Sequence, residues 1–218
     1  MTATNDPRDA PDLARLLERS MALHEALQTH FANAEVHDSS RSRLAVPTSQ
    51  IAIEHGTSIC MLVGAGNISS ASILLRTQFE AVVRAIWLCF VAKADWMSRY
   101  WTAVRANPMK DPNFSPGMDE MLKAIAQRAP PTIAPQLSAL KQAAWGPLNS
   151  FVHSGIHPVV LQHAGYPLDA ALGNVRNANG LTIMAYGVIA SLTDDRQLIS
   201  GLTAIQRTHL DCCPPLAG

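Results

Sequence analysis

The stretch Ser70–Phe90, SASILLRTQFEAVVRAIWLCF, decides the fold class of this chain. The helix that it predicts has apolar side chains on nearly every face, and such a helix has to be buried inside a larger structure. Arg76, Glu80 and Arg84 follow one another at four-residue steps, so they share one face of this helix. Because buried charges survive only when they are paired and hydrogen-bonded, this face marks either a structural clamp or a functional site.

Hydrophobic periodicity on both sides of this stretch predicts an all-α fold, a single-domain bundle of about seven to nine helices. The predicted helices cover residues 11–31, 47–64, 70–90 with a continuation through 101, 118–128, 136–145, a segment from 146 to 153, 168–192, and a last helix that ends near 210. The whole chain, 1–218, is then one domain, with flexible tails at 1–10 and 211–218 and a proline-rich loop at 106–117.

Composition favours self-association and argues against a general affinity for nucleic acid. Hydrophobic residues make up 48% of the 218 residues and charged residues only 16%, which is a charge-poor composition for a monomer. We therefore expect a homo-oligomer, and a homodimer is its simplest form. Lysine plus arginine and aspartate plus glutamate both number 17, so the formal net charge of zero gives no global attraction for a polyanion.

The sequence predicts a cytoplasmic protein without a membrane-spanning helix. Its first residues, MTATNDPRDAPD, lack the basic and apolar regions of a secretion signal. Arg76, Glu80 and Arg84 interrupt the most apolar segment, residues 73–92, and each of them is costly at the centre of a bilayer. The four cysteines show no Cys-x-x-Cys spacing and fit a reducing compartment.

Arg76 and Glu80 are spaced to form an ion pair within one helix, and Arg84 lies one further turn along. One interpretation is a structural clamp that neutralises itself. The other starts from the two cations that face one anion, because an unpaired guanidinium can donate two parallel hydrogen bonds to a phosphate or carboxylate. In that interpretation Arg76, Arg84, His153 and His157 bind a small anionic ligand.

A second group of candidate residues lies in the segment WGPLNSFVHSGIHP, residues 145–158. Asn149 and His153 are four residues apart, as are His153 and His157. Histidines at this spacing can bind zinc, with Glu80 as a third ligand, but no His-Glu-x-x-His motif or cysteine pair accompanies them. We therefore expect no metal and no cofactor, and an imidazole at 153 that either packs in a polar network or acts as an acid or base.

The helix predicted for residues 168–192 carries Gly173, Gly180 and Gly187 at seven-residue steps. Each glycine costs about 1 kcal/mol of helix propensity relative to alanine, which suggests the close approach of another helix, either within the bundle or from a second copy. The polar interruption at residues 176–179 is expected to face the same space as the histidine segment.

Four stretches, LLRTQFEAVVRAIWL, LNSFVHSGIHPV, GYP and VRNANGL, resemble a group of uncharacterised bacterial helical proteins that is distantly similar to the HEPN superfamily. The similarity spans residues 50–205 and implies a HEPN-like bundle. Catalytic HEPN ribonucleases carry an arginine, a polar residue, three variable residues and a histidine, which act across a dimer interface without a metal. Asn149 and His153 match the polar and histidine positions, whereas Leu148 replaces the arginine.

Two functions follow from these residues. The first is a non-enzymatic, dimeric bundle in which Arg76, Glu80 and His153 form a buried polar network that holds the packing or a small anion. The second, implied by the resemblance, is a degenerate HEPN-type ribonuclease, a toxin or defence component acting on RNA. Its catalytic residues would be His153, Arg76, Glu80 and Asn149, with Arg76 supplying the guanidinium that the motif lacks.

Overall fold

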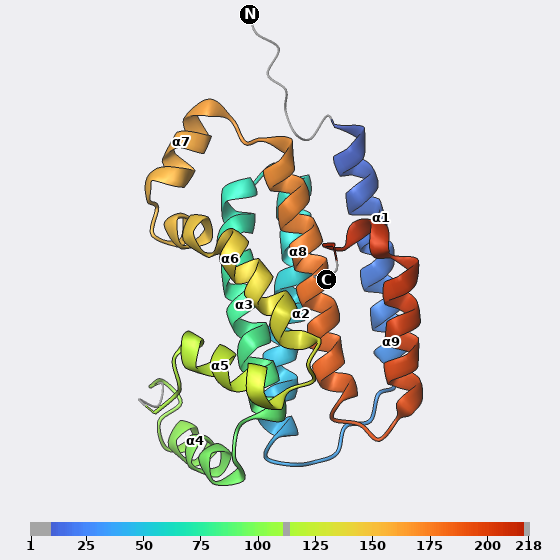
Figure 1. Ribbon diagram of the computed structural model, residues 1–218, viewed down its shortest axis with the longest axis vertical. Coiled ribbons are helices and arrows are strands. Elements are labelled where there is room, and N and C mark those ends of the chain that lie inside the picture. The colour runs from blue at the N-terminus through green and yellow to red at the C-terminus, as the bar shows by residue number, and fades with distance from the viewer. Residues whose placement is uncertain (1–9, 111–113, 216–218) are drawn as a thin grey trace, which may run out of the picture.

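The computed structural model describes residues 10–110 and 114–215, and in these residues the fold is all-α, without a β-strand (Figure 1). Its elements are α1 (Pro11–Phe31), α2 (Ser42–Gly64), α3 (Ile68–Phe90), α4 (Ala94–Ala106), α5 (Met118–Arg128), α6 (Ile133–Val152), α7 (Ile156–Ala164), α8 (Leu168–Ala190), α9 (Arg196–Thr208) and the 3-10 turn η2 (Leu210–Cys212). The predicted fold class and helix number are therefore confirmed for the described residues.

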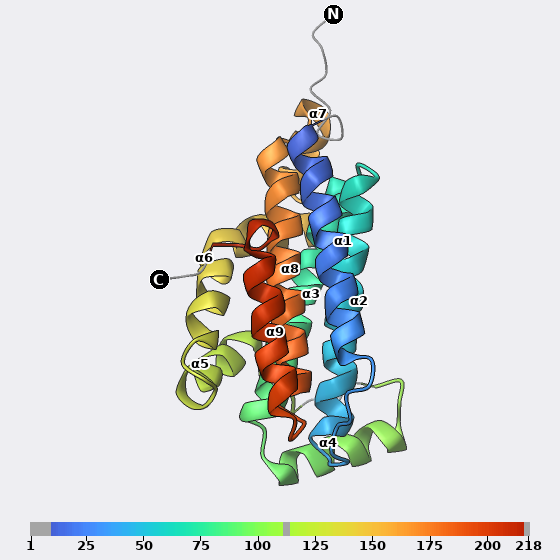
Figure 2. The same cartoon turned by 90° about the vertical axis from the view of Figure 1, so that its right-hand side faces the viewer.

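The long helices α1, α2, α3 and α8 run side by side and form the body of the bundle (Figures 1 and 2). Helix α9 packs along α1 and α8, whereas α6 crosses α3. Helices α4 and α7 lie at opposite ends of the long axis (Figure 1). This arrangement places α8 between α6 and α9.

Helix α3 is the central helix that the quoted stretch predicts. Thirteen of its 23 residues are buried, among them Leu75, Phe79 and Ile86. They pack against buried residues of α2 and α8, such as Ile59 and Val175. Burial of this much apolar surface is the main force that assembles the helices.

Helix α3 ends at Phe90, so its predicted continuation through residue 101 is wrong. The guanidinium of Arg41 donates hydrogen bonds to the carbonyl groups of Leu88, Cys89 and Ala92. These groups include carbonyls that the end of a helix leaves without intrahelical partners, and a cation is also favoured at that end of the helix dipole. The chain turns there, and α4 is a separate helix.

Three other predicted boundaries were wrong because prolines interrupt helices less than expected. Helix α2 begins at Ser42 and contains Pro47, and α6 runs unbroken through Pro147. Both Pro147 and Ala143, whose carbonyl loses its usual partner at position 147, are exposed, so water can replace the missing hydrogen bond. Helix α7 was not predicted at all, yet its Pro158 occupies the first turn, where no amide donor is needed.

The predicted loop and tails are only partly matched. Residues 107–110 and 114–117 are outside any helix, as predicted. The beginning of the predicted C-terminal tail is packed, because Cys212 and Cys213 are buried against the bundle. Residues 1–9 and 216–218, which belong to the predicted tails, lie outside the described residues.

Candidate functional site

Arg76 and Glu80 form the ion pair within α3 that their spacing predicts. The guanidinium of Arg76 also lies over the indole ring of Trp145 on α6, with 3.4 Å between the guanidinium carbon and the ring centroid. The ring of Phe79 on α3 packs against the same Trp145 ring in a T-shaped arrangement, with 5.6 Å between the two ring centroids. The arrangement clamps α6 onto α3.

The charge of Arg76 is therefore already compensated. Its side chain is only 13% exposed, while that of Glu80 is 40% exposed, and the buried Nε of Arg76 has no hydrogen-bond partner. Lys141, one turn before Trp145, pairs with Asp119 of α5. These contacts join α3, α5 and α6, which is the role of a structural clamp.

Arg84 is half-buried on α3, and no ion pair is found for it among the described residues. Glu80, its nearest predicted partner along the helix, contacts Arg76 instead. The anion-binding set of Arg76, Arg84, His153 and His157 stays a prediction, in which Arg84 rather than Arg76 carries the uncompensated charge.

Asn149 and His153 lie one turn apart at the end of α6, and both are exposed. His157, in the first turn of α7, is exposed as well. The expectation that His153 belongs to a buried network with Arg76 and Glu80 is therefore wrong. Leu148, at the position of the HEPN arginine, is buried and leaves Asn149 and His153 on the solvent side of the helix.

A tight turn fixes the angle between α6 and α7. The amide of Gly155 donates to the carbonyl of Ser150 at 2.7 Å, and the amide of Ser154 donates to Phe151 at 3.2 Å. This pattern is a Schellman motif, whose left-handed residue is usually glycine. Here the residue is Ser154, with φ 49°, so α7 is held in place by a turn that carries some backbone strain.

Sequence reasoning missed a buried polar network that surrounds His24 of α1. The His24 side chain is 5% exposed, and its Nε2 lies 3.1 Å from Oδ1 of Asn179 on α8. Asn179 Nδ2 donates to Ser20 Oγ at 2.8 Å and to the carbonyl of Cys212 at 2.7 Å. Because that carbonyl can only accept, Oδ1 of Asn179 is the acceptor that faces His24, and Nε2 carries the proton.

The other ring nitrogen of His24, Nδ1, lies 3.1 Å from the hydroxyl of Thr57 on α2. Burial lowers the pKa of His24, an effect that the hydrogen bond with Asn179 partly opposes. Because this imidazole is neutral, has both ring nitrogens in hydrogen bonds and is buried, its role is structural. It joins α1, α2, α8 and the end of the chain, and the polar interruption at 176–179 faces this network through Asn179 rather than the histidine segment.

The described residues contain no cluster of three or more side chains suited to a metal. All four cysteines are buried and free, and burial raises the pKa of Cys60 to about 12. Among the helices of the described residues, none combines the length and the apolar character needed to cross a bilayer.

Comparison with known proteins gives one match, to the model of a family of unknown function, DUF6988, over residues 49–215. No curated protein and no solved structure matches the chain significantly. The HEPN resemblance thus stays a prediction from the motif. Because the matched region runs from α2 to the C-terminal turn and covers more than half of the chain, this protein belongs to the DUF6988 family.

Proposed function

We propose that this protein is a non-enzymatic helical interaction module that pairs with a second copy of itself. The pairing surface, called here the α6–α7 surface, consists of Val152, Ile156, Val159 and Val160. The observation that carries the proposal is that α7, a largely apolar helix, has no buried residue. Its main contacts are with α6 alone.

The apolar residues of α7 form one stripe. Ile156, Val159 and Val160 are spaced at i, i+3 and i+4, so they share a face of the helix. Their exposed fractions are 68%, 58% and 51%, and Val152 at the end of α6 is 39% exposed. A stripe of this kind normally faces a core, and here it faces solvent.

A second copy is the partner that best fits the charge of this surface. Between Lys141 and Asp169 the chain has no aspartate, glutamate, lysine or arginine. A two-fold axis brings each group close to its own copy, so like charges would repel across it, whereas a neutral apolar stripe complements itself. The tight turn at Ser154 also holds α7 in one orientation, which lowers the entropy lost on pairing.

The size of the α6–α7 surface predicts a weak dimer. Nine helical residues span about 13 Å, and a standard interface buries roughly 800 Å² per partner, more than so short a helix offers. We therefore expect dissociation constants in the range of about 10 µM to 1 mM.

Sedimentation velocity from about 1 µM to 1 mM protein tests the proposal. The wild-type chain should shift from monomer to dimer, and Ile156→Lys should remain monomeric because it places two like charges at the axis. The matched control is Met61→Lys on α2, since Met61 is 67% exposed and lies outside the α6–α7 surface. A wild-type chain that stays monomeric throughout, or equal loss of dimer in the control, would contradict the proposal.

A degenerate HEPN-type ribonuclease is the second candidate, favoured by the exposure of both Asn149 and His153 beside the α6–α7 surface. Pairing through this surface would bring two Asn149–His153 sets toward each other. Purified wild-type protein that cleaves RNA without added metal, with cleavage lost in His153→Ala, would establish this function. If the wild-type protein cleaves no RNA at concentrations at which it dimerises, the ribonuclease function is excluded and the non-enzymatic module is supported.

Binding of a small anion is a further proposed property of the non-enzymatic module. Arg84 would attract the anion, because Arg76 is already paired with Glu80. Inorganic phosphate should then raise the melting temperature of the wild-type chain and have no effect on Arg84→Gln. Equal response of the two chains would remove anion binding from the proposed function.

A further inference from the structure

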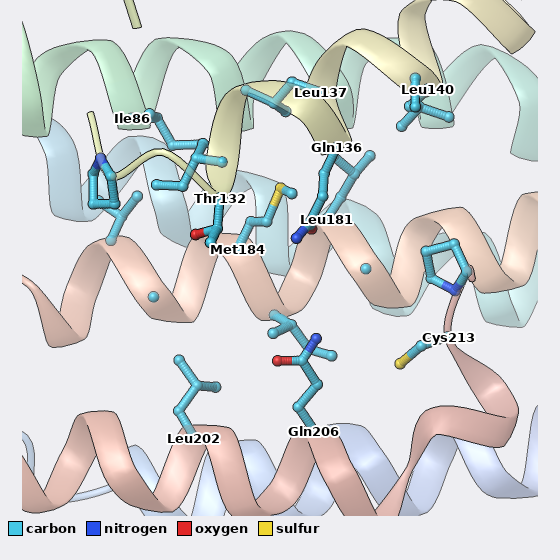
Figure 3. A pocket seen from close by; sticks show the side chains of 18 of the residues that line it. Ile86, Thr132, Gln136, Leu137, Leu140, Leu181, Met184, Leu202, Gln206 and Cys213 are labelled. Carbon is cyan, nitrogen blue, oxygen red and sulfur yellow. The ribbon is translucent and has the colours of Figure 1, made fainter. Parts of the chain in front are cut away.

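An open cavity of about 480 Å³ lies between α6, α8 and α9 (Figure 3). We propose that it binds an uncharged, largely apolar small molecule. Its walls include Ile86 of α3, Leu137 of α6, Leu181 and Met184 of α8 and Leu202 of α9. Cavities that bind small molecules in proteins usually measure about 300 to 1,000 Å³ and are mostly apolar, and this one has both properties.

The lining determines the charge of the ligand. None of the described residues that line the cavity is an aspartate, glutamate, lysine, arginine or histidine. A charged ligand would lose hydration on entry without gaining a counter-charge, whereas an apolar one gains from leaving water. The cavity therefore selects against the anions that Arg84 could attract.

The polar side chains of the lining are those of Thr132, Gln136, Asn177, Ser191 and Gln206, together with the thiol of Cys213, and the two glutamines face each other across the cavity. Gln136 of α6 and Gln206 of α9 extend toward each other from opposite walls (Figure 3). Both side chains are half-buried, and their amide groups can donate to and accept from a ligand. A hydroxyl or carbonyl group on an otherwise apolar molecule would satisfy them.

The glycines of α8 explain why the space is open. An added Cβ at Gly187 would find its nearest neighbour, Cδ2 of Leu202, at 3.8 Å, which is ordinary contact distance. At Gly180 the added Cβ would lie 2.8 Å from Cγ of Pro214, so the C-terminal segment packs directly on α8 and closes that end of the cavity. Within the described residues, the close approach predicted for the glycine line is found at Gly180, where the C-terminal segment makes it.

The C-terminal segment that closes the cavity is fixed to the bundle by hydrogen bonds. The cavity is therefore preformed. The carbonyl of Cys212 accepts a hydrogen bond from Asn179, and Arg19 bonds to the carboxylate of Asp211 at 2.8 Å. A preformed cavity loses little conformational entropy when a ligand enters.

The test uses two probes that share one ring system. N-phenyl-1-naphthylamine is uncharged, and 8-anilinonaphthalene-1-sulfonate adds one negative charge. The uncharged probe should bind the wild-type chain saturably with a rise in fluorescence, and the sulfonate should bind at least about tenfold more weakly.

Gly187→Leu fills the cavity and should weaken binding of the uncharged probe at least about tenfold. Gly173→Leu is the matched control, because Gly173 lies on the same helix with no atom within 4 Å of an added Cβ and does not line the cavity. Ala139→Trp, at an exposed position of the wall, is a second blocking variant that leaves the core untouched. Equal binding by the blocked variants and the control, or tighter binding of the sulfonate, would overturn the proposal.

Discussion

The guanidinium of Arg76 lies 3.4 Å from the centroid of the Trp145 ring, and this contact is what joins the charged face of α3 to α6. The ion pair between Arg76 and Glu80 stays within α3 and is partly exposed on the Glu80 side. Solvent screens exposed ion pairs, whereas a guanidinium as buried as that of Arg76, at 13% exposure, retains more of its attraction to an aromatic ring. The stacking contact therefore holds the two helices together more than the ion pair does.

Trp145→Ala should lower the free energy of unfolding by about 3 kcal/mol, because it removes both the cation–π contact and the packing against Phe79. Glu80→Gln should change it by less than about 1 kcal/mol. Urea denaturation followed by circular dichroism measures both. A larger loss for Glu80→Gln than for Trp145→Ala would show that the ion pair, not the stacking contact, is the stabilising element.

A double-mutant cycle isolates the contact itself. Arg76→Met, Trp145→Leu and the combined variant should give a coupling free energy of about 1 kcal/mol. A coupling energy of zero would mean that the two side chains contribute to stability independently.

Substitutions in the Schellman turns that end α2 and α6 should have opposite effects on the free energy of unfolding. Gly66 follows α2 with φ 80°, whereas Ser154 holds the equivalent left-handed position after α6 with φ 49°. Ser154→Gly should raise the free energy of unfolding by about 1 kcal/mol, and Gly66→Ser should lower it by a similar amount. Thermal unfolding of the two variants checks this, and changes of the same sign would contradict the assignment of strain to Ser154.

Local patterns in the sequence predicted the local features of this structure. The Arg76–Glu80 pair follows from four-residue spacing, and the predicted α8 agrees with the structure within two residues at its end. Asp195, the N-cap of α9, accepts a hydrogen bond from the amide of Gln197. Each of these depends on residues less than five positions apart, which is the range over which sequence alone fixes geometry.

Contacts between distant residues could not be predicted. Trp145 meets Arg76 across two helices, and His24 and Asn179 are 155 positions apart. A histidine on an amphipathic helix looks the same in sequence whether its neighbour is water or another helix. Helix α7 was missed for a different reason: Gly155 and Pro158 normally end helices, yet here they lie at its N-cap and in its first turn.

The cysteine thiols should be unreactive in the folded protein. Burial raises the pKa of Cys60 to about 12 and that of Cys89 to about 11, so these two thiols form almost no thiolate at neutral pH. The hydrogen bond with Cys213 lowers the pKa of Cys212, but the Cys212 side chain is fully buried, so a reagent cannot reach it in the folded protein. Titration with 5,5′-dithiobis(2-nitrobenzoate) should detect far less than one fast-reacting thiol in buffer and all four in denaturant. A fast-reacting native thiol would show that the packing of at least one cysteine opens readily.

The buried imidazole of His24 should make the free energy of unfolding decrease as the pH falls. Burial lowers its pKa in the folded state below the ordinary value of 6.5, so between these two pKa values the unfolded chain binds a proton that the folded chain does not. The free energy of unfolding should therefore fall as pH decreases below about 6.5 and be insensitive to His24 above about pH 7.5.

Urea denaturation at intervals between about pH 5 and 8 measures this slope, above the range in which most carboxylates titrate. His24→Gln should flatten the slope at some cost in stability, because glutamine does not titrate. His153→Gln is the matched control, since His153 is exposed and its replacement leaves the His24 network intact. If His24→Gln kept the wild-type slope while His153→Gln lost it, the pH dependence would come from the surface rather than from the buried network.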